Sequence, residues 1–389
     1  MSTPEVLFQR LQPIPPAHPR PWFPTLPVIG RAGGAGQAFP VASRFLAPDT
    51  LMVPSGKVAT YWALRDAGVG PGDRVAVPAY HCPTMIYPIV ALRARPVFMP
   101  VERGLELTAG AVAEALRERV RAVILPHYFG FVQPDTEAVM AACRDAGAVL
   151  VEDCAHALYA RRGSALPGAW GDYAIASTRK FVPGSEGGAL VANQGQRSHP
   201  RREPGWTDEL RGLWRLLGDA AEVGAIRWPA ATPTGLIGPP DEAAAAREAL
   251  PTPAPAAEID ASACDRLALR SVRRLFANAD HDRIAAVRRR RYARWAEALG
   301  ALPQVRAFAP TLADDQVPYV FPVRLSSPQA QFRALKYRGI AVWRWDHLAQ
   351  SRCAVSAELA LSLIQLPCQH SLDDDAFERL VREFTLALS

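Results

Sequence analysis

The sequence predicts an α/β fold in which a mainly parallel central sheet domain is followed by a smaller α+β domain. Short apolar runs alternate with helical patterns over residues 49–195, which is typical of βαβ units. The chain has 389 residues, 49% of them apolar, and can bury a sizeable core. Because a Pro-rich passage at 239–260 interrupts the pattern, we expect an irregular arm over 1–48, a large domain over 49–250 and a small domain over 251–389.

The elements of the large domain follow from their apolar spacing. Helical spacing predicts helices over residues 58–69, 84–94, 108–118 and 135–147. Continuous apolar runs bounded by Gly, Pro and Asp predict strands over 73–80, 95–101, 121–128, 149–153, 173–177 and 186–191. In such sheets, ligands sit beyond the carboxyl ends of the strands, where Tyr80, His127 and Asp153 fall.

The small domain is read from the same two patterns. A long helix is expected over residues 266–299, and further helices over 327–339 and 373–388. Strands are expected over 317–325 and over 340–345, IAVWRW. Helices and strands in this order predict an α+β domain.

Composition argues against several classes of protein. The amino terminus lacks the features of a signal peptide, and no run approaches the ~20 apolar residues of a membrane span, so we expect a cytoplasmic protein. Six cysteines are scattered without the spacing of a zinc site or a disulfide framework, and reduced thiols and no metal are expected. They are Cys82, Cys143, Cys154, Cys264, Cys353 and Cys368.

The charge balance is basic, with a net charge of +6 and a pI near 9.1. Its one dense run, Arg288 to Arg291, lies in an amphipathic helical pattern with no nucleic-acid motif beside it. We interpret the run as a solvated helix face and expect no nucleic-acid partner and no membrane partner.

One acid and one lysine carry the strongest chemical signal. Asp153 ends the apolar run VLVED, and Lys180 lies between the strand patterns YAIAS and EGGALV. Pyridoxal phosphate (PLP) chemistry needs a carboxylate at the cofactor's ring nitrogen and an amine for its aldehyde. On position alone, Asp153 could equally cap a turn. Lys180 favours the catalytic interpretation, because lysine is scarce here beside arginine and only lysine forms Schiff bases.

The cofactor's phosphate requires hydrogen-bond donors. Ser55, Gly56 and Lys57 open the first predicted helix, and a helix amino terminus is a favoured anion site. Ser177, three residues before Lys180, offers a further hydroxyl. A Ser-Gly pair is also a common helix cap, so its weight comes from the residues that accompany it.

Six segments together resemble the DegT/DnrJ/StrS family of sugar aminotransferases, which are fold type I PLP-dependent transferases related to aspartate aminotransferase. They are PSGKVA, GVGPGDRVAVPAYHCPT, RAVILPHYFGFVQPD, VEDCAHA, STRKFVPGSEGGALV and LPCQHSLDDDAFERLV. The resemblance covers about residues 50–195 and 265–389. It implies that Asp153 meets the pyridine nitrogen, that Lys180 is the Schiff-base lysine and that His156 lies against the cofactor.

The chain departs from the family pattern at several positions. Cys82 stands where an aromatic residue stacks on the ring, so Tyr80, His81 or His156 would have to supply that contact. Ser177 lies closer to the lysine than usual, and Phe181 replaces a polar residue. In residues 258–262, the segment that reaches the neighbouring subunit's site in the family is unrecognisable.

Two histidines and the WRW sequence are candidates for substrate contacts. For His127 and His347 we rank structural hydrogen bonding ahead of catalysis, and His347 stays a substrate-binding candidate because of the loop it occupies. Trp343, Arg344 and Trp345 are expected to line an acceptor pocket, with Arg344 gripping a carboxylate or phosphate.

The resemblance implies an aminotransferase that moves an amino group from an amino-acid donor to a keto sugar, nucleotide-linked, in polysaccharide or secondary-metabolite biosynthesis, and acts as a homodimer. Two alternatives stay open. One is a PLP-dependent dehydratase or lyase, although family dehydratases carry histidine in place of Lys180. The other is a catalytically silent binding or regulatory protein.

Overall fold

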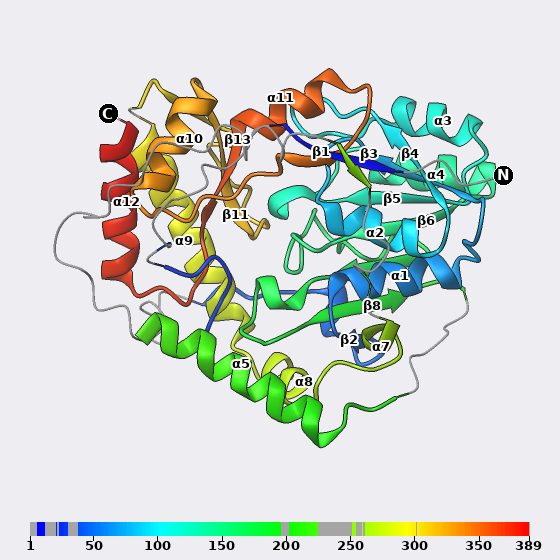
Figure 1. The fold of residues 1–389 in the computed structure, drawn as a ribbon, viewed down its shortest axis with the longest axis horizontal. Helices are drawn as coiled ribbons and strands as arrows, with labels where there is room; N and C mark the ends of the chain where they lie inside the picture. The colour runs from blue at the N-terminus through cyan, green and yellow to red at the C-terminus, as the bar shows by residue number, and fades with distance from the viewer. Residues whose placement is uncertain are drawn as a thin grey trace.

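A seven-stranded sheet forms the centre of the computed structural model (Figure 1), which describes residues 6–11, 21, 23–29, 38–195, 202–224, 251–253, 259, 261–300 and 302–388. Its strands are β2 (Leu51–Val53), β3 (Arg74–Pro78), β4 (Arg95–Met99), β5 (Ala122–Pro126), β6 (Val149–Asp153), β7 (Tyr173–Ala176) and β8 (Gly188–Ala192). They lie in the order β2-β8-β7-β6-β5-β3-β4. Strands β3 to β7 run parallel, and β8 is antiparallel to β2 and β7. The predicted mainly parallel sheet is confirmed.

Helices cover both faces of this sheet, because side chains alternate along each strand. Val75 and Val77 pack into the core under α1 (Gly56–Asp66) and α2 (Pro83–Ala91). Ala76, between them, packs on the other face under α3 (Ala109–Arg117) and α4 (Thr136–Ala146). The carboxyl ends of the parallel strands are left open at one edge, where two short 3-10 helices follow β5 and β7: η2 (Tyr128–Gly130) and η3 (Thr178–Lys180). A third, η1 (Arg44–Leu46), precedes β2, and its Arg44 side chain bonds Asn193 beyond the end of β8.

The C-terminal part has its own antiparallel sheet and core. Strands β10 (Val305–Ala307), β11 (Val320–Leu325) and β13 (Leu363–Pro367) lie in that order. Figure 1 shows α9 (His281–Leu299), α10 (Pro328–Tyr337) and α12 (Asp374–Leu388) gathered beside them, and their apolar faces close a core around Trp295, Phe321 and Phe384.

A third, small sheet ties the N-terminal segment to the C-terminal part. Strand β1 (Leu7–Arg10) pairs antiparallel with β12 (His347–Ala349) and with β9 (Thr252–Pro253). The remaining helices are α5 (Trp206–Gly224), α7 (Ala261–Cys264), α8 (Arg270–Ala277) and α11 (Ala354–Ser362). Among the described helices, none is both long and apolar enough to cross a bilayer. The Pro-rich passage 239–260 lies outside the described residues, apart from 251–253 and 259.

Two predicted elements of the C-terminal part are wrong. The single helix expected over 266–299 is two helices, α8 and α9, which are separated at Asn278–Asp280, where the Asp280 side chain caps the second helix. The strand expected over 340–345 forms only an isolated bridge at Trp343, and the regular strand begins at His347. Strand β13, LIQLP, is not among the predicted elements, and only its last two residues, Leu366 and Pro367, fall within the segment LPCQHSLDDDAFERLV that carries the family resemblance.

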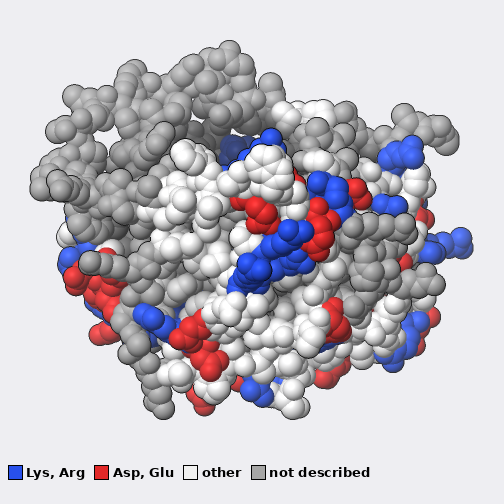
Figure 2. Space-filling view, turned by 90° about the horizontal axis from the view of Figure 1, so that it is seen from below, with Lys and Arg blue, Asp and Glu red and all other residues white. Residues whose placement is uncertain are grey.

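The arginine run on α9 is not a solvated face, which corrects our interpretation of it. Arg288 is 0% exposed and Arg291 is 2% exposed. The Arg288 guanidinium donates to the carbonyl oxygens of Tyr319 at 2.7 Å and Lys180 at 2.6 Å. Two of the four arginines, Arg288 and Arg291, therefore donate to buried backbone carbonyls, and one of these carbonyls belongs to Lys180. Figure 2 shows basic and acidic side chains beside one another on the face of the molecule that carries α5 and α8.

Candidate active site

A cavity of about 340 Å³ opens between the carboxyl edge of the large sheet and the C-terminal part. The sheet side contributes residues from β6, from η3 and from the start of α1. The opposite wall comes from β11, from β13 and from the extended segment 341–345, while Thr25 of the N-terminal arm reaches the rim. This volume lies in the range of small-molecule sites. Seven of the predicted site residues line it: Ser55, Gly56, Lys57, Asp153, His156, Ser177 and Lys180.

Asp153 faces this cavity from the end of β6, a central strand of the sheet. One carboxylate oxygen, Oδ1, accepts a hydrogen bond from the Ala155 amide at 2.9 Å. Part of the side chain is accessible from the cavity, yet burial by the surrounding protein raises its pKa, while the Ala155 bond and the positive charge of Lys180 oppose that rise. An additional cation in the cavity would favour the ionised carboxylate.

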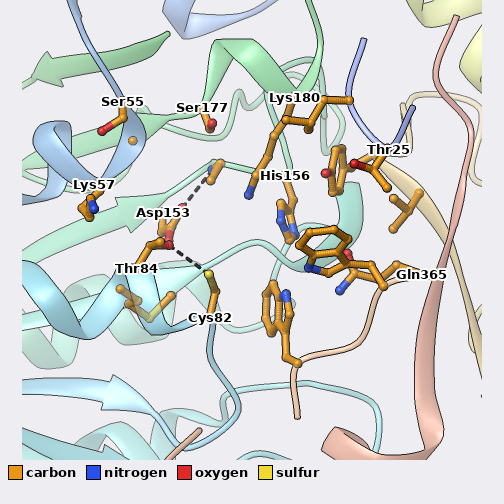
Figure 3. A pocket seen from close by; sticks show the side chains of 18 of the residues that line it. Thr25, Ser55, Lys57, Cys82, Thr84, Asp153, His156, Ser177, Lys180 and Gln365 are labelled. Carbon is orange, nitrogen blue, oxygen red and sulfur yellow. Dashed lines mark hydrogen bonds between the residues drawn. The ribbon is translucent and has the colours of Figure 1, made fainter. Parts of the chain in front are cut away.

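Lys180 enters the same cavity from η3, between β7 and β8, as the strand pattern predicted. Its amide donates to the Ser177 carbonyl, and its own carbonyl accepts from Arg288, so both sides of the peptide backbone are fixed. The ammonium nitrogen, Nζ, lies 5.4 Å from the centre of the Tyr319 ring. Burial lowers the pKa of this amine, whereas the neighbouring Asp153 carboxylate acts to raise it. Figure 3 shows Lys180 and Asp153 pointing into one space.

The buried amine makes stability depend on pH. Its lowered pKa means that the folded apoprotein disfavours the charged form, so the destabilisation is fully present below the folded-state pKa. It disappears as the pH rises through that pKa toward the ordinary value of 10.5. In urea titrations, Lys180→Met should therefore be more stable than the wild type at pH 7, with the difference shrinking toward pH 10. A constant difference across that range would contradict this.

Ser55, Gly56 and Ser177 meet at the other end of the cavity. Ser55 is the N-cap of α1, and its hydroxyl oxygen accepts from the Val58 amide at 3.2 Å, which leaves its proton available to donate. A Cβ on Gly56 would lie 3.4 Å from the Ser177 Cβ, so the two backbones are in close contact. With Lys57 in the first turn, this end combines hydroxyls, a helix amino terminus and a cation, which together suit a phosphate.

The backbone at the start of α1 also lies in close contact with Gly188, and only a residue without a Cβ fits there. A Cβ at this position would lie 2.2 Å from the carbonyl carbon of Ser55. Gly188→Ala should therefore displace the start of α1, at a cost of about 1–3 kcal/mol or more, and weaken PLP binding. Gly70→Ala is the matched control, because no atom lies within 4 Å of its added Cβ. Thermal melts and PLP titrations of both variants test this; equal behaviour would contradict it.

His156 lies within a group of stacked rings beside Lys180. Its ring is 4.5 Å from that of Tyr319 and 5.5 Å from that of Phe129, at interplanar angles of 20° and 17°. Nδ1 accepts a hydrogen bond from the Phe129 amide, and burial holds the pKa of His156 well below its usual range. The imidazole is therefore neutral with its proton on Nε2.

Four predicted site residues lie outside the cavity lining, namely Tyr80, His81, Arg344 and His347. Tyr80 is fully buried against Trp345, and burial raises its pKa. His81 donates from Nδ1 to the Ala79 carbonyl and accepts at Nε2 from the Ala349 amide, so it fastens β12. His347 lies in β12 beside Phe8, at 5.2 Å between ring centres.

Arg344 does not face the cavity, contrary to our expectation for it. In an extended segment, successive side chains point to opposite sides. Trp343 and Trp345 line the cavity, while Arg344 points away and binds the Asp346 carboxylate at 2.9 Å. Its guanidinium also stacks 3.7 Å above the Phe332 ring. Asp346 and Phe332 together keep the Arg344 side chain turned away from the cavity.

Several residues of this region were missed from sequence. Tyr319 packs against Lys180 and His156, but it was read only as part of a strand. Glu152 is fully buried behind Asp153 and accepts from three backbone amides and from His127. The sequence feature that could have pointed to Glu152 is its position inside the apolar run VLVED, where a charged residue is unusual. The structural role preferred for His127 agrees with that bond.

The positions that depart from the family pattern have defined surroundings. Cys82 lines the cavity, and its sulfur lies 2.9 Å from the Thr84 hydroxyl (Figure 3). Phe181 is fully buried against Tyr159, with Arg288 stacked on it at 4.5 Å. Phe181 thus anchors the backbone after Lys180.

Comparison with known proteins extends these observations. A GDP-perosamine synthase from Vibrio cholerae is 30% identical over 144 residues, which is 36% of this chain and 39% of that protein. An L-glutamine:scyllo-inosose aminotransferase from Streptomyces griseus is 33% identical over 144 residues, 36% of this chain and 34% of that protein. The chain therefore matches less than half the length of these curated relatives.

Solved structures share the fold over nearly the whole chain. The Streptococcus pneumoniae protein Spr1654, in its PLP form, superposes with a TM-score of 0.63 at 15% identity, covering 94% of this chain and 98% of that one. At this identity the likeness establishes the fold alone. Residues 45–201 match the model of the DegT/DnrJ/EryC1/StrS aminotransferase family, which is PLP-dependent. Over this segment, which is less than half of its length, the chain is similar to the DegT/DnrJ/EryC1/StrS aminotransferases.

Proposed function

We propose that this protein is a PLP-dependent aminotransferase that moves an amino group from an amino-acid donor to a keto sugar, nucleotide-linked, in polysaccharide or secondary-metabolite biosynthesis. One observation carries the proposal: a half-buried lysine and a half-buried aspartate face one cavity, each affecting the other's pKa. The names of two relatives support the acceptor class: one is a dTDP-4-dehydro-2,3,6-trideoxy-D-glucose 4-aminotransferase and the other an L-glutamine:scyllo-inosose aminotransferase.

The residues present fit PLP. The cavity brings together a carboxylate for a ring nitrogen, an amine for an aldehyde and a serine-lined helix terminus for a phosphate. The rise in the pKa of Asp153 is itself informative, because it marks a carboxylate with less positive charge nearby than its burial requires. A protonated pyridine would supply that charge.

Each residue then has a defined task. When bound, PLP supplies the electron sink for the carbon that exchanges its proton. Asp153 would hold the ring nitrogen in its protonated form through its negative charge. The Lys180 amine, whose pKa is lowered by burial, would accept and return a proton at Nζ. His156, neutral and donating from Nε2, and Tyr319 would limit the movement of the amine and exclude water.

Spectroscopy and labelling test the proposal directly. Purified protein with PLP should absorb in the visible range. Borohydride reduction should attach the cofactor covalently to Lys180, and a peptide map should find this label there. Addition of L-glutamate should then change the absorbance of the bound cofactor. Protein that stays colourless with added PLP, or a label elsewhere, would refute the function.

We further propose a homodimer. One face of α5 is apolar and exposed, with Trp206 at 75% and Trp214 at 80%, together with Leu210, Leu213 and Leu217. Monomeric proteins rarely leave such a face uncovered. Sedimentation should therefore give a dimer, and Trp214→Glu should shift it toward monomer. A monomeric wild type would contradict this. The cytoplasmic location stays a prediction.

A further inference from the structure

An unpaired amide faces the acceptor side of the cavity. Gln365 is the one polar residue of β13, LIQLP, and is 4% exposed. Its side-chain nitrogen, Nε2, is buried, and no described residue accepts a hydrogen bond from it. Buried donors in native proteins are almost always paired, so this nitrogen is available to a ligand in the cavity that Gln365 lines.

Strand register places an indole beside this amide. Gln365 forms an antiparallel bridge with Trp343, in which the backbone N–H of Gln365 donates to the backbone carbonyl of Trp343 at 2.7 Å. Side chains of directly opposed residues point to the same face of a sheet. Trp343, which is 54% exposed, therefore flanks Gln365 on the cavity wall. Figure 3 shows Gln365 among the side chains that line the cavity.

This wall offers a ligand a neutral hydrogen-bond donor and an apolar surface. Neither side chain carries a charge, and the neighbouring Arg344 points away and is bound to Asp346. A hydroxyl, carbonyl or carboxylate oxygen can accept from Nε2, but this wall offers a carboxylate no cation to pair with. The flat indole suits the apolar C–H face of a saturated ring.

We propose that Gln365 and Trp343 form a subsite for the acceptor, in which Nε2 donates to an oxygen of a six-membered polyhydroxylated ring while the indole stacks on its C–H face. This inference rests on the proposed function and adds which residues recognise the acceptor. The nucleotide part of a sugar nucleotide, where present, would extend past Trp343 toward solvent.

Calorimetry with four probes tests the subsite: dTDP-glucose, UDP-N-acetylglucosamine, GDP-mannose and myo-inositol. At least one should bind the PLP-loaded wild type, and Gln365→Leu and Trp343→Ala should each weaken that binding about tenfold, as expected for loss of one hydrogen bond or one stacking contact. Binding of none of the probes, or equal affinity in the variants, would overturn the subsite.

Two further measurements separate a binding role from a structural one. Gln365→Leu should melt no lower than the wild type, because it removes an unpaired buried amide. The control Gln331→Leu should melt lower, since that amide bonds Gln304 and Ser327. A large loss of stability in Gln365→Leu would mean that the amide is structural. Labelling of Lys180 in the wild type reports on the proposed function separately.

Discussion

Replacing Lys180 with alanine should abolish borohydride labelling and lower transamination by about 10³-fold or more. The variant loses the one amine that faces Asp153 in the cavity, and with it both the covalent attachment of the cofactor and the group that moves the proton. Binding of PLP through the phosphate end should persist, because Ser55, Gly56 and Ser177 are unchanged.

The chain provides a clean control for this experiment. It contains three lysines, Lys57, Lys180 and Lys336. Lys336 lies on α10 against Phe332, outside the cavity lining, so Lys336→Ala should keep both the label and the activity. Peptide mapping with three candidate lysines is unambiguous. Activity of Lys180→Ala within tenfold of the wild type would mean that another group performs the chemistry.

Chain order alone was sufficient to place Asp153 and Lys180 in one site. Parallel strands end at the same edge of a sheet, so residues that follow neighbouring strands come together there. β6 and β7 are such neighbours, and η3 follows β7 directly. The pattern of apolar runs was sufficient for the large sheet for the same reason, because each buried strand is a separate apolar segment.

The cavity wall formed by the C-terminal part could not be derived in this way. Whether Trp343 or Arg344 faces the cavity depends on which side of an extended segment is buried, and that is decided by its packing on β13. Gln365 becomes visible only once the register of that pairing is known. The arginines of α9 were misjudged because their acceptors are backbone carbonyls, which have no sequence signal.

The largest loss of stability is expected from Glu152, which lies next to Asp153 and points to the opposite face of β6. Its carboxylate is 0% exposed and accepts from the amides of Gly168, Trp170 and Gly171 at 2.6–2.9 Å, and from His127 at 3.0 Å. Glu152→Ala leaves these donors buried without an acceptor. Breaking such a buried arrangement costs about 3–5 kcal/mol, a large share of the stability of a typical domain.

Urea denaturation of the apoprotein measures this loss, and two variants define its origin. Glu152→Gln keeps one acceptor oxygen and should lose less than Glu152→Ala. Glu118→Ala removes an exposed partner of Arg74 and should change stability little. Because Glu152 fixes the loop 168–171 and the end of β6, Glu152→Gln should also weaken PLP binding through displacement of Asp153. Wild-type stability in Glu152→Ala would show that water replaces the carboxylate and that the site does not depend on it.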